Sequence, residues 1–333
     1  MIAVTGASGL LGNAVVRRLV EQGKSVLAIK RRDSDISLLN DLDGKIKWHD
    51  ADILDTLSLS EALKDATHVI HAAAAVSFNP RKARRIMDIN VLGTRNVVDT
   101  CLALGIGRLV HVSSVAALGR QKGQKLISEN NKWIDSPLHS TYAKAKYLAE
   151  LEVYRGQEEG LSSVIINPSV ILAEGNWNLS SAQLFKYVWE EKPFYFDGSL
   201  NYVDVDDLVG LIETLLESNI QGERFIASAG KISYFEFFEM VALQFNKKKP
   251  SIRLGNTLLK AGAVAEGLLS RITGNEPRLT RETARLAGAE FTFENQKIRN
   301  SLNFEFQPID KTLKRCCGYY MAKMNPKKLA ETS

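Results

Sequence analysis

A tyrosine and a lysine stand four residues apart in the segment Tyr142-Ala143-Lys144-Ala145-Lys146. The apolar spacing around them predicts a helix, and residues four apart on a helix share one face, so the phenol and the ammonium can act on the same bound molecule. A free phenol has a pKa of about 10, too high for proton exchange at neutral pH, and an adjacent cation favours the phenolate. The spacing therefore predicts a proton-exchanging pair, with a tyrosine that only packs on its helix face as the alternative.

Three glycines, Gly6, Gly9 and Gly12, follow the first apolar run of the chain. The run before them is typical of a strand and the segment after them of a helix, so they lie at a strand-to-helix junction. Glycines allow a tight turn there, and the amides and dipole of the helix can receive a phosphate. The segment from Thr5 to Gly12 is therefore predicted to bind a dinucleotide pyrophosphate, with a merely structural turn as the alternative.

Strand-like and helix-like segments alternate over the first half of the chain, which predicts an α/β fold with a Rossmann-type doubly wound parallel sheet. The strand-like runs are Ile2 to Val4, Ser25 to Ile29, Ile46 to His49, His68 to Ala72, Arg108 to Val112 and Ser163 to Ile166, and the helical segments are Gly9 to Gln22, Leu57 to Lys64, Ala83 to Leu104 and Tyr142 to Glu159. Gly23, Gly105 and Gly160 stand just past helical segments, where a left-handed cap is expected.

The alternation ends near Ile171, and irregular segments follow before Tyr202 to Leu216 resumes a strand feeding a helix. We expect a dinucleotide-binding domain over residues 1–172 plus about 200–226, and a smaller C-terminal substrate-binding lobe over 173–199 and 227–333. Apolar helices are expected near Phe235 to Phe245 and Leu258 to Ile272. Asp206 or Asp207 is expected to cap the helix that follows, and no metal site is predicted.

The chain resembles the extended short-chain dehydrogenases/reductases, which form the superfamily of NAD-dependent epimerases and dehydratases. The glycines are spaced as GxxGxxG, and Tyr142 and Lys146 match the YxxxK signature. Asn167-Pro168-Ser169 and the stretch from Gly198 to Leu208 look most like the dihydroflavonol-4-reductase and 3β-hydroxysteroid-dehydrogenase-like branch. The resemblance covers residues 1 to about 226 well and the remainder only loosely.

The resemblance implies a set of cofactor-binding residues. Asp52 and Ile53 look like the pair that contacts adenine, the alanines after His71 like the wall beside the cofactor, and Asn90 like the helix asparagine that steadies the site. The full implied set is Gly6, Ser8, Gly9, Leu10, Leu11, Gly12, Lys30, Arg31, Asp52, Ile53, Ala72, Ala73, Ala74, Asn90, Val112, Tyr142, Lys146, Pro168 and Ser169.

The resemblance also implies a catalytic trio of Ser114, Tyr142 and Lys146. Ser114 closes a strand, where its hydroxyl can hydrogen-bond a substrate carbonyl oxygen, and Ser113 is the alternative. A hydride would pass between the nicotinamide and a carbonyl or alcohol carbon, while Tyr142 exchanges the proton and Lys146 lowers its pKa and anchors ribose. Reduction of a ketone or aldehyde is the leading reaction.

Two other functions stay open. A nucleotide-sugar epimerase or dehydratase would retain NAD and usually binds the sugar diphosphate with an arginine of the C-terminal lobe; Arg224, Arg253, Arg271 and Arg278 are available. A non-catalytic cofactor sensor or scaffold is the second rival. Relatives of that kind commonly lose the tyrosine or the lysine, and this chain keeps both.

The residues after the second strand predict NADP(H) as the preferred cofactor, with NAD(H) as the alternative. An NAD-specific site commonly ends this strand in an acid that repels a 2′-phosphate. Here Lys30, Arg31 and Arg32 occupy that place, and Asp33 comes later. A guanidinium can stack on adenine and hydrogen-bond a phosphate through two nitrogens, so Arg31 is the better candidate, with Lys30 or Arg32 adding charge.

The composition excludes several other classes. With 43 basic and 38 acidic residues among 333, the net charge of +5 is slight and indicates no nucleic acid partner. Cys101, Cys316 and Cys317 offer no disulfide framework, and the chain opens directly on a strand with no room for a signal peptide, so a cytoplasmic protein is expected. No apolar run approaches the roughly 18 residues of a membrane span. For Leu258 to Ile272, burial as a lobe helix is favoured over contact with a membrane surface.

Two expectations concern the partners of the protein. The helical segments Ala83 to Leu104 and Tyr142 to Glu159 resemble helices that pair across a two-fold axis in extended relatives, which implies a homodimer sharing Val97, Leu148, Leu151 and Val153. The substrate is expected to be a largely apolar small molecule, because Phe185, Trp189, Phe194, Tyr195 and Phe196 lie in the expected lobe. That these rings simply form the core of the lobe is the alternative.

Overall fold

A seven-stranded parallel sheet organises the first part of the chain. Its strands are β1 (Ile2–Thr5), β2 (Val26–Lys30), β3 (Lys47–Asp50), β4 (His68–His71), β5 (Arg108–Val112), β7 (Ser163–Pro168) and β11 (Arg224–Ala227). They run in the order β11-β7-β5-β4-β1-β2-β3, and every neighbouring pair is parallel. The chain passes outward from β1 to β3 and then returns to β4 on the other side of β1, so the order reverses between β1 and β4. The predicted Rossmann-type doubly wound sheet is confirmed.

The computed structural model describes residues 1–121, 123–136, 139–255 and 291–324. These residues divide into two units. The first contains 1–169, 205–227 and 293–304, and the second contains the described residues within 170–204, 228–292 and 305–333. The sequence assigned everything after residue 227 to the smaller lobe, whereas residues 293–304 belong to the first unit. That segment includes α11 (Gln296–Leu302), which packs against β11.

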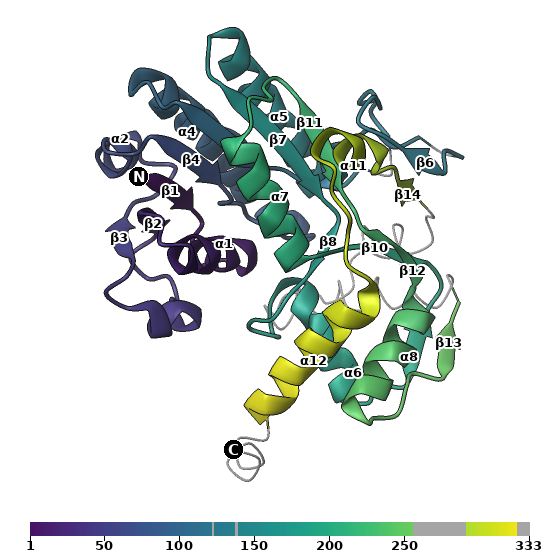
Figure 1. The fold of residues 1–333 in the computed structure, drawn as a ribbon. Helices are drawn as coiled ribbons and strands as arrows, with labels where there is room; N and C mark the ends of the chain where they lie inside the picture. The colour runs from purple at the N-terminus through teal and green to yellow at the C-terminus, as the bar shows by residue number, and fades with distance from the viewer. Residues whose placement is uncertain (122, 137–138, 256–290, 325–333) are drawn as a thin grey trace. The chain divides into compact units, whose positions relative to one another are not determined.

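Helices cover both faces of the parallel sheet (Figure 1). On one face, α1 (Leu10–Glu21) packs against α7 (Val205–Glu217); on the other, α4 (Gly93–Ala103) packs between α2 (Thr56–Leu63) and α5 (Thr141–Glu158). A buried apolar cluster joins α2, α4 and α5 to the strands and includes Leu27, Leu59, Val69, Val97 and Leu109. Burial of this cluster stabilises the layer by about 25 cal/mol for each Å² of apolar surface removed from water.

Short elements connect these layers. They are η1 (Ser37–Leu42), η2 (Pro80–Lys82), α3 (Ala83–Met87), η3 (Asp88–Leu92), η4 (Val115–Ala117), β6 (Leu126–Ile127) and β14 (Thr292–Phe293). The predicted left-handed caps are confirmed at Gly23, Gly105 and Gly160, whose φ angles are +72°, +63° and +100°. Only glycine adopts such angles without strain, so these residues end their helices sharply.

The segment 83–103 is not the single regular helix that the sequence predicted. The helix α3 passes into η3, a π-helical turn in which Gly93 N–H donates to the carbonyl of Asp88, and then into α4. The Thr94 hydroxyl also donates to the Asn90 carbonyl, at 2.6 Å. Such π turns interrupt α-helices frequently at functional sites.

The second unit is built on smaller sheets and an aromatic core. The strands β8 (Val170–Leu172), β10 (Ser199–Asp204) and β12 (Gly230–Ser233) form one sheet, and β9 (Phe194–Phe196) pairs with β13 (Ile252–Leu254). Its helical segments are η5 (Ser180–Ala182), α6 (Gln183–Trp189), α8 (Tyr234–Phe245) and α12 (Ile309–Met324).

The aromatic residues predicted to face a substrate contact other rings of this second unit. Phe185 is fully buried and packs on Phe237 and Tyr320, with ring centroids 5.9 and 5.4 Å apart. Trp189 packs edge-on against Phe245, at 5.2 Å. Tyr195 and Phe196 pack at tilted angles against Phe235 and Tyr234, respectively, while Phe194 is 40% exposed. The structure therefore places Phe185 in the core of the lobe.

Two further expectations concern the acidic residues at the start of α7 and the apolar segment near residue 260. Asp206 and Asp207 lie inside the first turn of α7, which begins at Val205, where acidic side chains complement the helix dipole. The segment Leu258 to Ile272 lies outside the described residues. Among the helices that are described, none has the length and apolar character needed to cross a bilayer.

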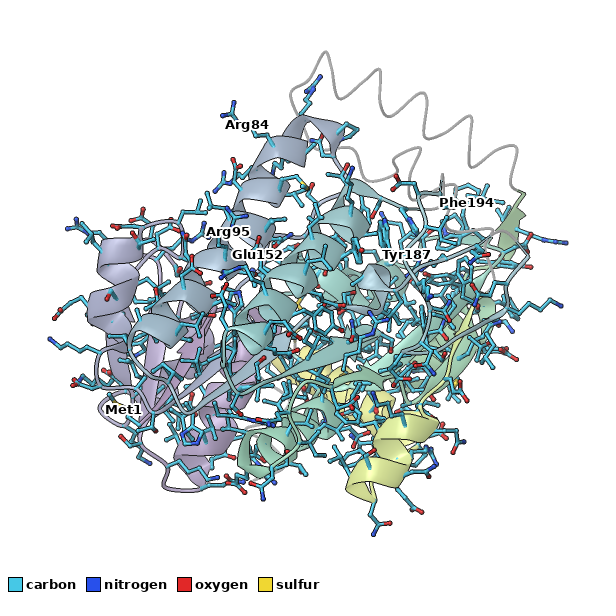
Figure 2. The ribbon with its side chains drawn as sticks, turned by 90° about the horizontal axis from the view of Figure 1, so that it is seen from above. Met1, Arg84, Arg95, Glu152, Tyr187 and Phe194 are labelled. Carbon is cyan, nitrogen blue, oxygen red and sulfur yellow. The ribbon has the colours of Figure 1, made fainter. Side chains whose placement is uncertain are left out.

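The outer surface of α4 and α5 is charged. Arg95 donates to Glu152 at 2.8 Å, and Figure 2 shows these two side chains next to each other. Arg155 bonds Glu152, Asp99 and Glu159. Val97 and Val153, which the sequence assigned to a shared apolar interface, are fully buried within the chain itself, because both belong to the core beneath these helices. That part of the interface prediction is wrong, whereas of the other two predicted residues Leu148 is half-buried and Leu151 is 42% exposed.

Candidate active site

The glycine loop brings backbone against backbone at the end of β1. Gly6 has a φ of +70°, and a Cβ atom there would lie 2.7 Å from the Ala73 Cα after β4. A Cβ on Gly12 would collide with the Gly6 carbonyl oxygen. The Gly9 N–H donates to that same carbonyl at 2.9 Å, which closes the turn. The loop therefore requires glycine at both positions.

The N-terminus of α1 is suited to an anion. Gly9 occupies its N-cap and has no side chain to bond the first amides, and Leu10, Leu11 and Gly12 in the first turn are uncharged. Amides of a first turn lack partners within the helix, and the helix dipole attracts negative charge to them. Together with the two glycine contacts, this arrangement fits the pyrophosphate of a dinucleotide. Ser8 is half-buried in the same loop.

The three residues predicted to be catalytic come together at the carboxyl end of β5. Ser114 follows β5, and its hydroxyl lies near enough to the phenol of Tyr142 to act on the pKa of that phenol. Tyr142 lies in the first turn of α5, whose N-cap Ser140 accepts from Ala143 N–H at 3.0 Å. Lys146, one turn later, donates to the Val112 carbonyl at 2.8 Å. By contrast, the Ser113 hydroxyl is buried and has no hydrogen-bond partner among the described residues, so the geometry favours Ser114 over Ser113.

The protonation states differ from the sequence expectation at the tyrosine. Burial raises the pKa of Tyr142, and the nearby Ser114 hydroxyl opposes that rise only in part. Burial lowers the pKa of Lys146 to about 8, while the negative charge of Glu150 acts in the opposite direction. At neutral pH the lysine is therefore a cation and the tyrosine a neutral phenol, so the pair is set to donate a proton rather than to accept one.

Asn90 fixes the loop that follows β4. Its side chain accepts from Ala75 N–H at 2.8 Å and donates to the Ala75 carbonyl at 2.9 Å, and it is 1% exposed. This two-way amide contact holds the alanine segment Ala72 to Ala75 beside the glycine loop. Ala74 is exposed, and Ala72 and Ala73 are half-buried. The π turn η3 carries Asn90.

A buried histidine that the sequence left unassigned ties this loop to β1. His71 shares hydrogen bonds with the Thr5 hydroxyl at 2.7 Å and the Thr94 hydroxyl at 3.0 Å. Thr5 also accepts from Ala73 N–H at 3.3 Å. Burial, followed by the charge of Lys146, lowers the pKa of His71 to about 3. No local motif marks this residue, because its partners are 66 and 23 positions away.

The basic residues after β2 are used in two ways. Lys30 pairs with Asp50 on the neighbouring strand β3, with its Nζ 2.6 Å from the carboxylate oxygen. Arg31 and Arg32 are exposed, and no salt bridge found within the described ranges includes either of them. Arg31 follows the last residue of β2, so of these two exposed arginines it is the nearer to the end of this strand.

The remaining predicted residues are distributed around the same sheet edge. Asp52 is exposed, whereas Ile53 is 8% exposed and packs in the core against Gly93. Pro168 ends β7, and Ser169 is 7% exposed with its N–H donating to the Ala227 carbonyl at 3.0 Å.

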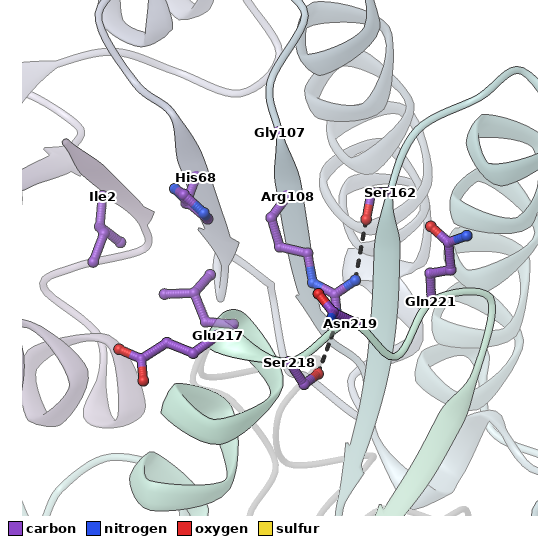
Figure 3. A pocket seen from close by; sticks show the side chains of 10 residues that line it. Ile2, His68, Gly107, Arg108, Ser162, Glu217, Ser218, Asn219 and Gln221 are labelled. Atoms are coloured by element: carbon purple, nitrogen blue, oxygen red, sulfur yellow. Dashed lines mark hydrogen bonds between the residues drawn. The ribbon is translucent and has the colours of Figure 1, made fainter.

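A cavity of about 440 Å³ lies at the opposite edge of the sheet (Figure 3). Ile2, His68 and Arg108 line it, at the amino ends of β1, β4 and β5. Ligands of doubly wound sheets bind at the carboxyl ends of the strands, so this cavity is not the candidate active site. Arg108 donates there to Ser162 and Ser218, as the dashed lines of Figure 3 show.

Comparison with known proteins identifies the class that this fold and site define. Residues 2–227 match the NAD dependent epimerase/dehydratase family. The chain belongs to this family, within the extended short-chain dehydrogenases/reductases.

Individual relatives match most of the chain. Sterol demethylase protein B of Methylococcus capsulatus is 26% identical over 308 residues, which cover 90% of this chain and 92% of the relative. The 3 beta-hydroxysteroid dehydrogenase/Delta 5-->4-isomerase of Vaccinia virus is 32% identical over 220 residues, covering 62% of this chain and 60% of the relative. Among solved structures, the crystal structure of gox2253 has a TM-score of 0.82 to this chain and a sequence identity of 29%. The match covers 97% of this chain and 98% of that one.

Proposed function

We propose that the protein is an NADP(H)-preferring oxidoreductase that reduces a ketone or aldehyde group on a largely apolar small molecule. The observation that carries the proposal is the contact of Ser114 with Tyr142, one helical turn before the buried cation of Lys146 and at the same sheet edge as the glycine loop. Enzymes that transfer a hydride need a group placed to exchange the matching proton, and this trio provides one.

Each residue of the trio has a defined task in this proposal. Tyr142 gives its phenolic proton to the carbonyl oxygen of the substrate, and Ser114 hydrogen-bonds the same oxygen as negative charge develops on it. Lys146 holds the ribose and stabilises the phenolate that Tyr142 becomes. When bound, the nicotinamide cofactor supplies the hydride to the carbonyl carbon. In the reverse direction the same groups would take up the proton of an alcohol.

The cofactor would be held by the residues at the carboxyl edge of the sheet. Gly6, Ser8, Gly9, Leu10, Leu11 and Gly12 would receive the pyrophosphate, Arg31 the 2′-phosphate, Asp52 and Ile53 the adenine, and Ala72, Ala73, Ala74, Asn90, Val112, Pro168 and Ser169 the remainder. Since Asp50 engages Lys30, the preference for NADP(H) depends on Arg31.

Two observations support an apolar substrate. Phe78 meets the ring of Tyr142 edge-on, with centroids 6.2 Å apart, so an apolar ring lies against the catalytic phenol, and Val76 in the same segment is 59% exposed. In addition, the names of two relatives refer to a sterol and a hydroxysteroid, which are both apolar molecules.

The rival function, a nucleotide-sugar epimerase or dehydratase, would need a free arginine for the sugar diphosphate. Arg224 donates to Glu150 and to the carbonyls of Glu129 and Asn131, so its guanidinium is already engaged. Arg253 forms a two-pronged pair with Asp197, at 2.9 Å for each contact. Arg271 and Arg278 lie outside the described residues. The non-catalytic sensor is disfavoured because the whole trio is present.

The wider setting of the enzyme is proposed on the family resemblance. We expect a cytoplasmic homodimer with α4 and α5 at the interface, and a second unit that selects the substrate. With Val97 and Val153 buried in the subunit, such an interface would use the charged residues around Arg155 together with Leu151.

The substitution Tyr142→Phe tests the proposed function. It removes one hydroxyl and keeps the ring, so turnover is expected to fall by at least about a hundredfold while cofactor affinity changes little. Cofactor oxidation would be followed with NADPH and NADH across a panel of apolar ketones and aldehydes. Tyr147→Phe, on the same helix but stacked on Trp133, is the matched control and should keep its activity. A Tyr142→Phe variant as active as the wild type would contradict the assignment.

A further inference from the structure

A third ionisable residue continues the line of Tyr142 and Lys146 along α5. Glu150 lies one turn after Lys146, and its side chain is 0% exposed. The spacing of four puts the phenol, the ammonium and the carboxylate on one face of the helix. An isolated carboxylate in such a position would be strongly disfavoured, so its partners decide whether it stays charged.

Two residues from neighbouring strands hold the Glu150 carboxylate. Arg224 of β11 donates to one oxygen at 3.2 Å, and the side-chain amide of Asn167, at the end of β7, donates to the other at 2.5 Å. The same Asn167 amide donates to the Ser114 carbonyl at 2.9 Å. A cation and an amide donor offset the cost of burying this carboxylate, and the amide links it directly to the backbone of a catalytic residue.

Two opposing influences act on the pKa of Lys146. The negative charge of Glu150 opposes the loss of the Lys146 proton, whereas burial favours that loss. The rings of His71 and His111 lie 5.1 Å apart, and burial and the charge of Lys146 lower the pKa of both, so both are neutral. Around Glu150 itself lie Arg224 and Tyr154, and beyond Arg224 lie Glu129, Glu223 and Lys297.

From this geometry we infer that Glu150 is a positioning residue for the proposed reaction: held by Arg224 and Asn167, it keeps Lys146 a cation and fixes Ser114 through the shared amide. The inference rests on the proposed function, because it assigns Glu150 the task of supporting the proposed catalytic trio. A purely structural ion pair between α5 and β11 would leave the charge of Lys146 unaffected by its loss.

The test is the pH dependence of cofactor affinity in the full-length protein. NADPH and NADH binding would be titrated through tryptophan fluorescence between pH 6 and 10, which requires no turnover. In the wild type, affinity is expected to fall above pH 8, as Lys146 loses its proton. Glu150→Gln keeps the shape and an oxygen for Asn167 but removes the charge, so this fall should move to lower pH by about one unit. The upper limb of kcat/KM should move with it.

Three further variants make the result specific. Glu150→Asp keeps the charge and should restore the wild-type pH profile. Glu152→Gln removes a carboxylate that pairs with two arginines on the outer side of α5, and it should leave the profile unchanged. If Glu150→Gln does not fold because Arg224 is left unpaired, Glu150→Gln/Arg224→Gln removes both charges; the profile should still move down, since Glu150 is the charge that acts on Lys146.

The outcomes separate the inference from the function on which it rests. A Glu150→Gln profile that coincides with the wild type, or a Glu152→Gln profile that moves equally far, overturns the positioning role. A wild-type protein that binds neither NADPH nor NADH overturns the proposed function.

Discussion

Two buried cations lie at opposite ends of β5 and have different surroundings. Arg108 begins the strand and is 4% exposed; its guanidinium donates to the Ser162 hydroxyl, the Leu215 carbonyl, the Ser218 hydroxyl and the Ile220 carbonyl. Lys146 is 2% exposed and meets the other end of the strand, where its ammonium donates to the Val112 carbonyl alone among the described residues. An ammonium has three donors, so two remain for a ligand.

The difference distinguishes a structural cation from a functional one. Arg108 donates to Ser162, to the last turn of α7 and to the segment that follows α7, and so joins these parts to the sheet. Lys146 carries the same desolvation cost without the same number of partners, and that imbalance is typical of a site that a ligand completes. Burial alone would not separate the two residues, but the number of satisfied donors does.

The largest expected effects come from replacing each cation by methionine, which keeps an apolar stem of similar length. Lys146→Met should lower kcat/KM by about a thousandfold, since both ribose binding and stabilisation of the phenolate are lost. Its free energy of unfolding should be at least that of the wild type, because a buried charge with few partners has been removed. Activity and denaturant unfolding would be measured on the same samples.

Arg108→Met is expected to have the opposite effects, a loss of stability without a loss of turnover. It removes one donor from the Leu215 carbonyl, which still accepts from the Ser218 hydroxyl, and one from the Ile220 carbonyl, so the free energy of unfolding should fall by about 1–3 kcal/mol. The turnover of the folded fraction should stay near that of the wild type. If Arg108→Met lost activity before it lost stability, or Lys146→Met lost stability first, the distinction between the two ends of β5 would be wrong.

A histidine between the two cations extends the comparison to acid stability. His111 lies on β5, is fully buried, and has a pKa well below its usual range because of burial and the charge of Lys146. The unfolded chain takes up a proton near pH 6.5 and the folded chain does not, so stability should fall as pH drops below about 6.5. By pH 5 one such histidine lowers the free energy of unfolding by about 2 kcal/mol.

His111→Phe removes this titration and breaks no hydrogen bond to a described residue, since both ring nitrogens of His111 have no such partner. Its free energy of unfolding should therefore decline less than that of the wild type between pH 7 and 5. His71 remains in the variant and continues to contribute acid sensitivity. Parallel declines in the two proteins would show that His111 is not the titrating group.

The smallest expected effect tests, at an exposed site, whether a cation without a salt-bridge partner among the described residues is the one that binds a ligand. Arg31→Ala should reduce the preference for NADPH over NADH by about tenfold, which is the worth of one charge-assisted phosphate contact near the surface. Lys30→Ala is the matched control, because Lys30 already pairs with Asp50 and should change the ratio less. Dissociation constants for both cofactors, at low and moderate salt, would decide this; equal effects of the two variants would remove Arg31 from its assigned place.

Local patterns in the sequence predicted much of the fold and the centre of the site. The glycines at the first strand-to-helix junction and the spacing of Tyr142 and Lys146 are signals within one turn or one loop, and the strands lie within a few residues of their predicted positions. The contacts of His71 and Glu150 could not be predicted in this way. Their partners come from other strands and, in the case of Thr94, from α4, and no short motif records which residues the fold brings together.

The errors have the same physical origin. Val97 and Val153 have the apolar character of an interface, but whether an apolar residue faces its own core or a second subunit depends on the rotation of α4 and α5 about their axes. The place of Lys30 beside Asp50 follows from the register of β2 and β3, in which these two residues are paired. Register and rotation are tertiary properties.

The π turn at η3 changes the phase of the helix that contains it. In a regular α-helix each residue advances by about 100° around the axis, and hydrogen bonds join residues four apart. In η3 the bond runs from Gly93 to Asp88, five positions back, so the turn contains one extra residue. Everything before the turn is thereby rotated relative to α4 by about a quarter of a revolution. Loss of one residue anywhere between Asp88 and Leu92 would leave a more regular helix. The face of α3 that now packs against its neighbours would then be rotated away relative to α4. The π turn thus sets the direction from which the Asn90 side chain reaches Ala75.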